Sequence, residues 1–453
     1  MRTTSILVLA ATLAAAPACD LDVPDLNNPG IGDLTDNPSA PAVTAACTGL
    51  IIGNRRNHAA ANGYVAQLGI IGREAYNFDQ ADPRFVGELL QGNLNPGSPF
   101  GGNFWAGPYA NIRLANTILT AVDKVPEFSA SDKSGIRGFT KTMIALDLLE
   151  VISTRDDIGA VIDTNHPVDA PLGPIADKTM VLAEIGRQLD DGAMDLAAGG
   201  DEFVFKLSNG YTGFDTPATF RKFNRAIRAR VAVYQKNYAV ALTALGESFI
   251  DDTAATVEDL DVGVYYSYST GAGDVTNSLT NPNIYAHPSL TTDAMKNGTA
   301  FDLRYTRKVK MTDKPGSAQG LTSDLKFTMY ASPDSPVPLI RNEELLLIRA
   351  EAKFFTSDVA GAMADLNIVR TVSGGLAPVG GNPAEDAFVT ALLYEREYSL
   401  LFEGHRWVDV RRFGRLDTLP LDKPDFTRNR RYPIPLQECN ARPGEAACAL
   451  TSV

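Results

Sequence analysis

The chain is poor in cysteine and histidine and has no excess of positive charge. Four cysteines and four histidines occur among 453 residues, with no Cys-x-x-Cys pair and no Cys/His cluster. This excludes a disulfide-stapled mini-domain and disfavours a structural zinc site. Acidic residues number 54 and basic residues 41, a formal charge of −13. A general nucleic-acid binder is disfavoured as well, because such proteins cluster positive charge against phosphates.

Long apolar runs and catalytic motifs are also absent from the sequence. Beyond the first residues, no continuous apolar run reaches the about 20 residues that a membrane-spanning helix needs. No GxSxG, HExxH, P-loop or EF-hand pattern occurs. These absences favour binding without catalysis, so we expect no enzyme activity, no cofactor and no metal site.

The N-terminus has the features of an export signal. Arg2 precedes the apolar stretch 6–16, which is too short to span a bilayer. The stretch ends in Ala16-Pro17-Ala18-Cys19, which resembles the lipobox of bacterial lipoproteins, with Ala16 where leucine is usual. We therefore expect residues 1–18 to be a signal peptide, Cys19 to be lipidated and the polar segment 19–38 to be a tether. The alternative is an ordinary signal peptide cut after Ala18.

Helical periodicity dominates the rest of the chain. Apolar residues recur at i, i+3, i+4 and i+7 in five stretches, about 39–57, 105–122, 133–152, 178–197 and 219–245. The last is divided at Lys236-Asn237 and predicts two helices joined by a tight turn. A second pair is expected at about 339–355 and from Val359 to Gly374-Gly375, joined by the turn Thr356-Ser357-Asp358, which can cap the second helix. A third helix should follow the Asn382-Pro383 start signal.

Short helix pairs with small residues at the crossings resemble the tetratricopeptide plan, without a clean 34-residue period. The helical period fades at about 247–337, which is rich in Gly, Asn, Thr and Pro. A long insertion of this kind is usually functional. The sequence thus predicts a mainly α fold of tetratricopeptide-like helix pairs, an α-α superhelix, with an irregular, loop-rich ligand-binding side. Near the C-terminus, Cys439 and Cys448 flank a short loop and could form a disulfide in an oxidising compartment, leaving Cys47 as a buried thiol.

The C-terminal third contains four motifs in order. They are 341–352 (RNEELLLIRAEA), 364–370 (ADLNIVR), 393–412 (LYEREYSLLFEGHRWVDVRR) and 431–438 (RYPIPLQE). Their order and spacing, most clearly over 339–438, are similar to those of the SusD/RagB family of lipid-anchored nutrient-binding proteins.

That resemblance implies a single SusD-like domain over 39–453. It also implies a lipid-anchored protein on the cell surface, in the outer membrane, that binds a nutrient and delivers it as a lid to a SusC-type TonB-dependent transporter. The nutrient is most often a glycan in this family. From the residues alone, an alternative is a tetratricopeptide-like scaffold that binds peptides or proteins.

Several charged residues of the third motif lie on apolar helix faces and need partners. Glu395 lies seven residues after Phe388, on the same stripe, and an unpaired buried carboxylate is costly. We expect a structural ion network, with Arg349, Arg406, Arg411 and Arg412 as candidate partners of Glu395. Its predicted members are Glu395, Glu403, Arg406, Asp409 and Arg412. A less favoured reading makes Glu395 and Glu403 the carboxylate pair of a glycoside hydrolase. His405 is expected to be packed or at the surface.

Ligand contacts are predicted at aromatic residues in loops, because sugar rings pack their C–H faces on aromatic planes while polar neighbours bind the hydroxyls. Two clusters fit this description. The first comprises Arg73, Tyr76, Phe78, Asn103, Phe104 and Trp105, and the second Tyr266 and Tyr268 on one face of an expected strand. Trp105 also begins an apolar stripe, so packing in the core is an alternative for it.

Overall fold

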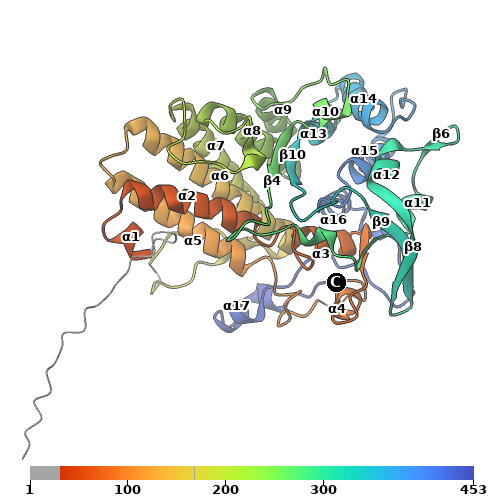
Figure 1. Cartoon of the computed structure of the whole chain (residues 1–453), viewed down its shortest axis with the longest axis horizontal. Coiled ribbons are helices and arrows are strands. Elements are labelled where there is room, and N and C mark those ends of the chain that lie inside the picture. The colour runs from red at the N-terminus through yellow and green to blue at the C-terminus, as the bar shows by residue number, and fades with distance from the viewer. Residues whose placement is uncertain (1–30, 93, 168) are drawn as a thin grey trace, which may run out of the picture.

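The computed structural model describes residues 31–92, 94–167 and 169–453. The expected signal peptide, Cys19 and most of the expected tether lie outside the described residues. The fold is mainly α-helical, as predicted, with short two-stranded sheets (Figure 1). Within the described part of the chain, no helix has both the length and the hydrophobicity that crossing a bilayer would require.

An array of long helices forms one side of the molecule. Consecutive members pack against each other, and Figure 1 shows them side by side on the left. They are α2 (Ala40–Arg55), α5 (Ala106–Ala121), α6 (Ala130–Arg155), α7 (Lys178–Ala197), α8 (Pro217–Tyr234) and α9 (Tyr238–Gly246). Side-chain caps start most of these helices, including a reciprocal capping box at Ser129 and Asp132. The predicted stretches and the observed helices agree closely.

Two tight turns join helix pairs in the same way. Helices α8 and α9 are connected through Lys236, whose φ is +56°, and α13 (Asn342–Phe355) meets α14 (Val359–Ile368) through Ser357, with φ +71°. In each pair an Asn or Asp side chain then caps the second helix: Asn237 accepts from the Val240 N–H and Asp358 from the Gly361 N–H. The predicted pairing of helices is thereby confirmed.

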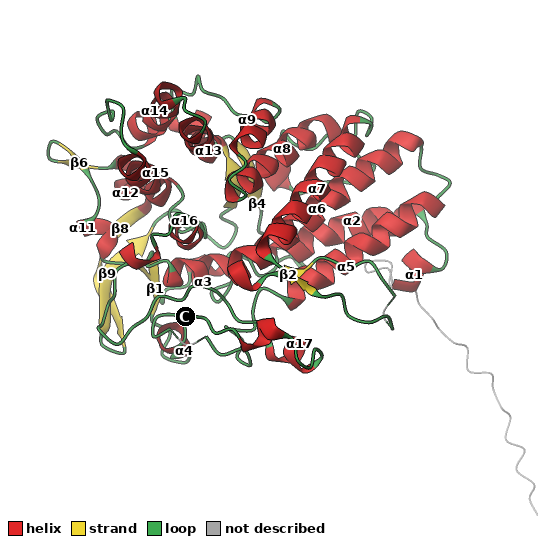
Figure 2. Ribbon diagram, turned by 180° about the vertical axis from the view of Figure 1, so that it is seen from behind, coloured by secondary structure: helices red, strands yellow, loops and turns green. Residues whose placement is uncertain are grey.

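Short strands, several short helices and the α13–α14 pair make up the opposite, irregular side (Figure 2). Five antiparallel strand pairs occur among the described residues: β1 (Ala75–Asn77) with β5 (Ile284–Ala286), β2 (Ala160–Val161) with β3 (Ile175–Ala176), β4 (Gly263–Tyr266) with β10 (Val337–Arg341), β6 (Lys296–Asn297) with β7 (Ala300–Phe301), and β8 (Val309–Ala318) with β9 (Leu321–Phe327). Most of these strands belong to the expected loop-rich insertion.

The remaining helices connect these strands to the array and to the C-terminus. They are α1 (Ile31–Thr35), α3 (Tyr64–Ile71), α4 (Arg84–Gly87), α10 (Val257–Leu260), α11 (Ser289–Thr292), α12 (Leu303–Lys308), α15 (Glu385–Ser399), α16 (Arg406–Arg412) and α17 (Leu436–Asn440). Helix α1 packs on α5, so residues 31–35 of the expected tether belong to the folded body.

Three boundaries differ from the sequence-based expectations. Residues 339–341 belong to strand β10, because they pair with β4, and the helix expected there begins at Asn342. Helix α15 has Ala384 rather than Asn382 at its N-cap, with no side-chain cap. Helix α14 passes into a π-helical turn over Val369–Ser373 before Gly374. Pairing and packing outweighed local start signals at these positions.

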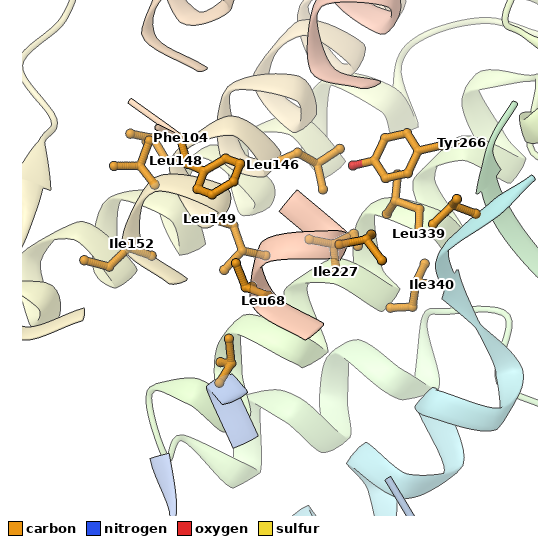
Figure 3. Close-up of a cluster of buried hydrophobic side chains, with 14 of the residues drawn as sticks. Leu68, Phe104, Leu146, Leu148, Leu149, Ile152, Ile227, Tyr266, Leu339 and Ile340 are labelled. Carbon is orange, nitrogen blue, oxygen red and sulfur yellow. The ribbon is translucent and has the colours of Figure 1, made fainter. Parts of the chain in front are cut away.

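A continuous apolar core joins the two sides. Figure 3 shows Leu146 of α6 and Ile227 of α8 near Leu339 and Ile340 of β10 and Tyr266 of β4, and Leu149 and Ile152 continue the cluster along α6. All are at most 8% exposed. A second apolar cluster lies between α13, α14 and α15, where the rings of Phe354 and Phe388 stack 3.9 Å apart. Strand β10 ends at Arg341 and α13 begins at Asn342, so no loop separates them.

Candidate ligand-binding site

A surface pocket of about 250 Å³ lies between α15, α16 and the turn that follows α16. Its walls combine apolar, aromatic, hydroxyl and charged side chains: Thr390, Leu393, Tyr394, Glu397, Arg406, Asp409, Val410, Arg415 and Thr418. The four residues of α15 are spaced at i, i+3, i+4 and i+7, and those of α16 at i, i+3 and i+4, so each set shares one helix face.

The charges in this pocket are paired. Glu397 Oε1 lies 3.0 Å from Arg406 Nη2, although it has no aligned hydrogen-bond donor. Burial raises the pKa of Glu397, and Arg406 opposes that shift. Burial also acts to raise the pKa of Asp409, but Arg396 and Arg412, at 2.7 and 2.9 Å, lower it overall. Arg415 pairs with Asp386, which is largely exposed. The two acidic and two basic side chains that line the pocket therefore leave it without a large net charge.

Two hydrogen bonds of its hydroxyl group hold Tyr394 in place. The hydroxyl donates to Asp302 Oδ2 at 3.0 Å and accepts from the Met295 N–H at 2.8 Å. Its ring packs 4.9 Å from that of Tyr398. A fixed aromatic ring beside paired carboxylate and guanidinium groups and two threonines suits a ligand with hydroxyls and an apolar ring face.

The predicted ligand residues Arg73, Tyr76 and Phe78 come together in the interior. Arg73 is fully buried at φ +58° and donates to backbone carbonyls, including those of Ile71 at 3.1 Å and Thr427 at 2.8 Å. The Tyr76 hydroxyl donates to Asp422, and the rings of Tyr76 and Phe78 stack 5.1 Å apart. In this structure they pack the β1–β5 region, and a ligand contact by them remains a prediction.

The second part of that predicted cluster surrounds Arg155. The guanidinium of Arg155 donates to the carbonyls of Asn103 and Phe104, at 2.6 and 3.3 Å, and lies over the ring of Trp105. Phe104 and Trp105 are 2% and 4% exposed, whereas Asn103 is half-buried. Trp105 is thus packed in the core, which is the alternative given for it in the sequence analysis.

Tyr266 and Tyr268 are both buried, in line with their expected common face. The Tyr266 ring packs 4.2 Å from His58, and burial raises the pKa of both tyrosines. Neither lines the α15–α16 pocket. Contacts of these tyrosines with a ligand therefore also remain a prediction.

The five residues expected to form an ion network are all in ion pairs. Glu395 pairs with Arg304 and Arg370, each at 2.6 Å, and not with any of the four arginines proposed from the sequence. Glu403 pairs with Arg341 at 2.5 Å. Arg412 joins Asp409 to Glu351. These are adjacent clusters rather than one set of contacts, because the partner arginines lie on different elements.

The sequence does not predict a ligand site at the α15–α16 pocket, which contains Tyr394, Glu397, Arg406 and Arg415. The helical spacing of Tyr394 and Glu397 was a usable signal, but their place on one pocket wall depends on how α16 crosses α15. Near the C-terminus, Cys439 and Cys448 form a disulfide and Cys47 is a buried thiol. His405 is half-buried, and burial lowers its pKa to about 4.

Comparison with known proteins assigns this architecture. The SusD family profile matches residues 260–441. Solved structures with TM-scores of 0.61 to 0.69 cover most of the chain. A SusD superfamily protein from Bacteroides vulgatus has 15% sequence identity and TM-score 0.69, with 91% of this chain and 98% of that chain covered. A SusD-like carbohydrate-binding protein from Bacteroides fragilis has 14% identity and TM-score 0.69, covering 88% and 98%.

A laminarin-binding SusD-like protein has 17% identity and TM-score 0.61, covering 88% of this chain and 97% of that chain. Comparison with curated proteins gives no significant match. The matched profile spans the four C-terminal motifs, and the structural matches extend the likeness over the helical array. From these findings together, residues 260–441 are similar to the SusD family, and the chain has the fold of the SusD-like solved structures.

Proposed function

We propose that the protein binds a glycan at the α15–α16 pocket, as an outer-membrane lipoprotein exposed on the cell surface, and delivers it as a lid to a SusC-type TonB-dependent transporter. The observation that carries the proposal is the pocket itself, which places Tyr394 beside the Glu397–Arg406 pair on a SusD-like fold. Solved relatives described as carbohydrate-binding and laminarin-binding support the ligand class.

The role proposed is capture without catalysis. The two carboxylates of the alternative glycosidase pair form ion pairs with arginines, Glu395 with Arg304 and Arg370, and Glu403 with Arg341. Each oxygen of the two carboxylates lies against a cation, with Lys308 as the second partner of Glu403, so neither group is free to reach a glycosidic bond. Turnover of a glycan that is lost in a folded Glu395→Gln variant would contradict this role.

Isothermal titration with a panel of oligosaccharides tests the pocket. Thr390 lies exposed on its rim and donates to the Asp386 carbonyl one turn earlier, so Thr390→Trp should fill the pocket without disturbing the core. Thr243 of α9 makes the same contact to Ala239 and is also exposed, which makes Thr243→Trp a matched control. Binding lost only in the Thr390 variant supports the site; equal binding in both places the ligand elsewhere.

The anchor and the partner are tested separately. Cys19→Ala should release the protein from membranes, and retention would mean another tether. Purification of the natively lipidated protein should recover a large outer-membrane barrel. Recovery of none would count against the transporter partnership, whatever the result for glycan binding.

A second candidate function, peptide binding, has its own observation. An open groove of about 550 Å³ runs between the outer face of α2 and the segment 202–206, and Thr44, Thr48 and Phe203 line it. A helix-lined groove is what a tetratricopeptide-like peptide receptor would offer. A Thr48→Arg variant should abolish peptide binding under this alternative and leave glycan binding unchanged under the main proposal.

A further inference from the structure

A small polar cavity lies where the helical array meets the irregular side, and it is partly open. Its volume is about 60 Å³. Helices α6 and α8, the start of α3, strands β4 and β10 and the segment 403–408 all contribute walls. Figure 3 shows Leu146, Leu149, Tyr266 and Leu339 of these walls converging from three elements. This volume is large enough for water molecules and too small for a sugar.

One carboxylate in this cavity lacks a partner. Glu150 of α6 lines the cavity, and no hydrogen bond or ion pair to its carboxylate exists among the described residues. The nearest cation on its own helix, Arg155, is occupied by the Asn103 and Phe104 carbonyls and the Thr154 hydroxyl. An unpaired charge in such surroundings is costly, so the group either holds a proton or acquires a counter-ion.

The other charges around the cavity are already compensated. Arg230 pairs with Glu344, its Nε 2.8 Å from Oε1, and Glu403 pairs with Arg341 at 2.5 Å. Asp147, one turn from Glu150, accepts from Asn54 and Asn111 at 2.7 Å each. None of these groups is free to neutralise Glu150.

The remaining polar groups that face Glu150 are neutral near pH 7. They are His58, Tyr64, Ser153, Tyr234, Tyr266 and His405. Burial lowers the pKa of His58 to about 3 and that of His405 to about 4. Burial raises the pKa of Tyr234 to about 12. His58 is 9% exposed, and its Nδ1 is buried without a hydrogen-bond partner. The two unpartnered polar side chains, Glu150 and His58, thus face no unpaired cation among the residues that line the cavity, because Arg230 is already paired with Glu344.

We propose that this cavity is an internal binding site for water and for one proton, in which neutral Glu150 and ordered water link α6 to His58 and to the 403–408 segment. A metal ion is not the favoured occupant: no group of three or more His, Cys, Asp or Glu side chains suited to a metal occurs in the described residues, and Arg230 faces the same space. Glu150 as a neutral carboxyl donates one hydrogen bond, which water passes on to acceptors such as His58 Nδ1.

The raised pKa of Glu150 determines how the stability of the protein should change with pH. Burial, and then the charge of Asp147, raise the pKa of Glu150 to about 8 from an ordinary 4.5. The folded protein then binds this proton more tightly than the unfolded chain. Stability from this group is fully present below about pH 4.5, falls as pH rises towards 8, and stays low above it.

Glu150→Gln keeps the shape of the side chain and removes the charge. The melting temperature of the variant minus that of the wild type should be near zero at pH 5, rise by several degrees up to about pH 8, and then level off. Asp147 and Glu74 also titrate in this range but are present in both proteins. Glu258→Gln, at an exposed site on α10, is the control and should give a flat difference. A flat difference for Glu150→Gln would overturn the proton assignment.

High-resolution crystallography tests the water directly. Density for water within hydrogen-bond distance of Glu150 and His58 is expected at neutral pH, with the same water kept in Glu150→Gln. A dry cavity, or a metal ion bonded to Glu150 at about 2.0–2.6 Å, would overturn the proposal. If a metal ion were bound, the added metal salt would also raise the melting temperature of the wild type and would not raise that of Glu150→Gln.

Discussion

Single residues in the C-terminal signature hold strained or buried positions that other side chains cannot take. Gly404 has φ +85°, and a Cβ atom there would lie 2.9 Å from a carbon of the Tyr64 ring. Both the left-handed backbone and the ring disfavour any other residue. Gly404→Ala should lower the free energy of unfolding by about 1–3 kcal/mol, as measured by urea titration. Gly213, with φ +82° and nothing within 4 Å, offers a control in which only the backbone strain remains. An equal loss in both variants would show that the Tyr64 contact adds nothing.

Acid should weaken the fold through its paired glutamates. Burial acts to raise the pKa of Glu344, but Arg230 outweighs it and lowers this pKa to about 2. A folded pKa below the ordinary 4.5 gives stability that is present above about pH 4.5 and is lost as pH falls towards 2.

Glu344→Gln removes that pH-dependent contribution and leaves Arg230 buried without its counter-charge. We expect a loss of about 3–5 kcal/mol near pH 7. The difference in the free energy of unfolding between the variant and the wild type should become smaller as the pH falls from 5 to 2. Urea unfolding at several pH values would measure it. A constant difference over that range would contradict the assigned pKa direction.

At the scale of the secondary-structure element, the N-cap of helix α14 can be tested directly by substitution. Asp358 accepts from the Gly361 N–H at 2.9 Å and so caps α14. Asp358→Ala should cost about 1 kcal/mol. Asp358→Asn, which retains a capping oxygen, should cost much less. Similar losses in the two variants would mean that the cap contributes little, and chemical denaturation would decide between these outcomes.

The Cys439–Cys448 disulfide closes a short loop after α17. By restricting the unfolded chain, such a cross-link adds about 2–3 kcal/mol. A Cys439→Ser, Cys448→Ser variant should therefore melt at a lower temperature, and a reducing agent should lower the wild-type melting temperature in the same direction. An unchanged melting temperature in the double variant would show that the loop is held by its other contacts.

Elements with strong helical periodicity could be predicted from the sequence, and pairings between distant segments could not. Helices α2, α5, α7 and α9 follow the predicted stretches within a few residues. The sequence predicts a helix from about residue 339, whereas residues 339–341 belong to β10, because the strand that pairs with them, β4, lies about 70 residues earlier. One partner of Glu395, Arg304, could not be predicted for the same reason, because it lies in the insertion, where no periodic signal is present.

The loop aromatics illustrate a related limit. Tyr76, Phe78 and Phe104 have polar and glycine-rich neighbours in the sequence, which suggested exposure. Their side chains are at most 4% exposed, because short strands and the C-terminal segment cover them. The α15–α16 pocket requires the crossing of two helices, and sequence spacing within one helix does not contain that information.

At the scale of the whole molecule, the apolar core is continuous across the helical array and the strands. Buried residues of α2 and α6 belong to the same cluster as those of β5 and β9. We therefore expect a single calorimetric unfolding transition, whose van't Hoff enthalpy matches the calorimetric enthalpy. Two resolved transitions would mean that the insertion unfolds independently.

The direct passage from β10 into α13 has a mechanical consequence. Arg341 is the last residue of the strand and pairs with Glu403, while Arg230 of α8 donates to the Leu339 carbonyl in the same strand. With no flexible joint at this junction, a displacement of the strand cannot be absorbed locally and must tilt α13. A force on the irregular side is therefore transmitted through β10 to α13. We expect the rates of amide hydrogen exchange in β10 and α13 to change in the same direction.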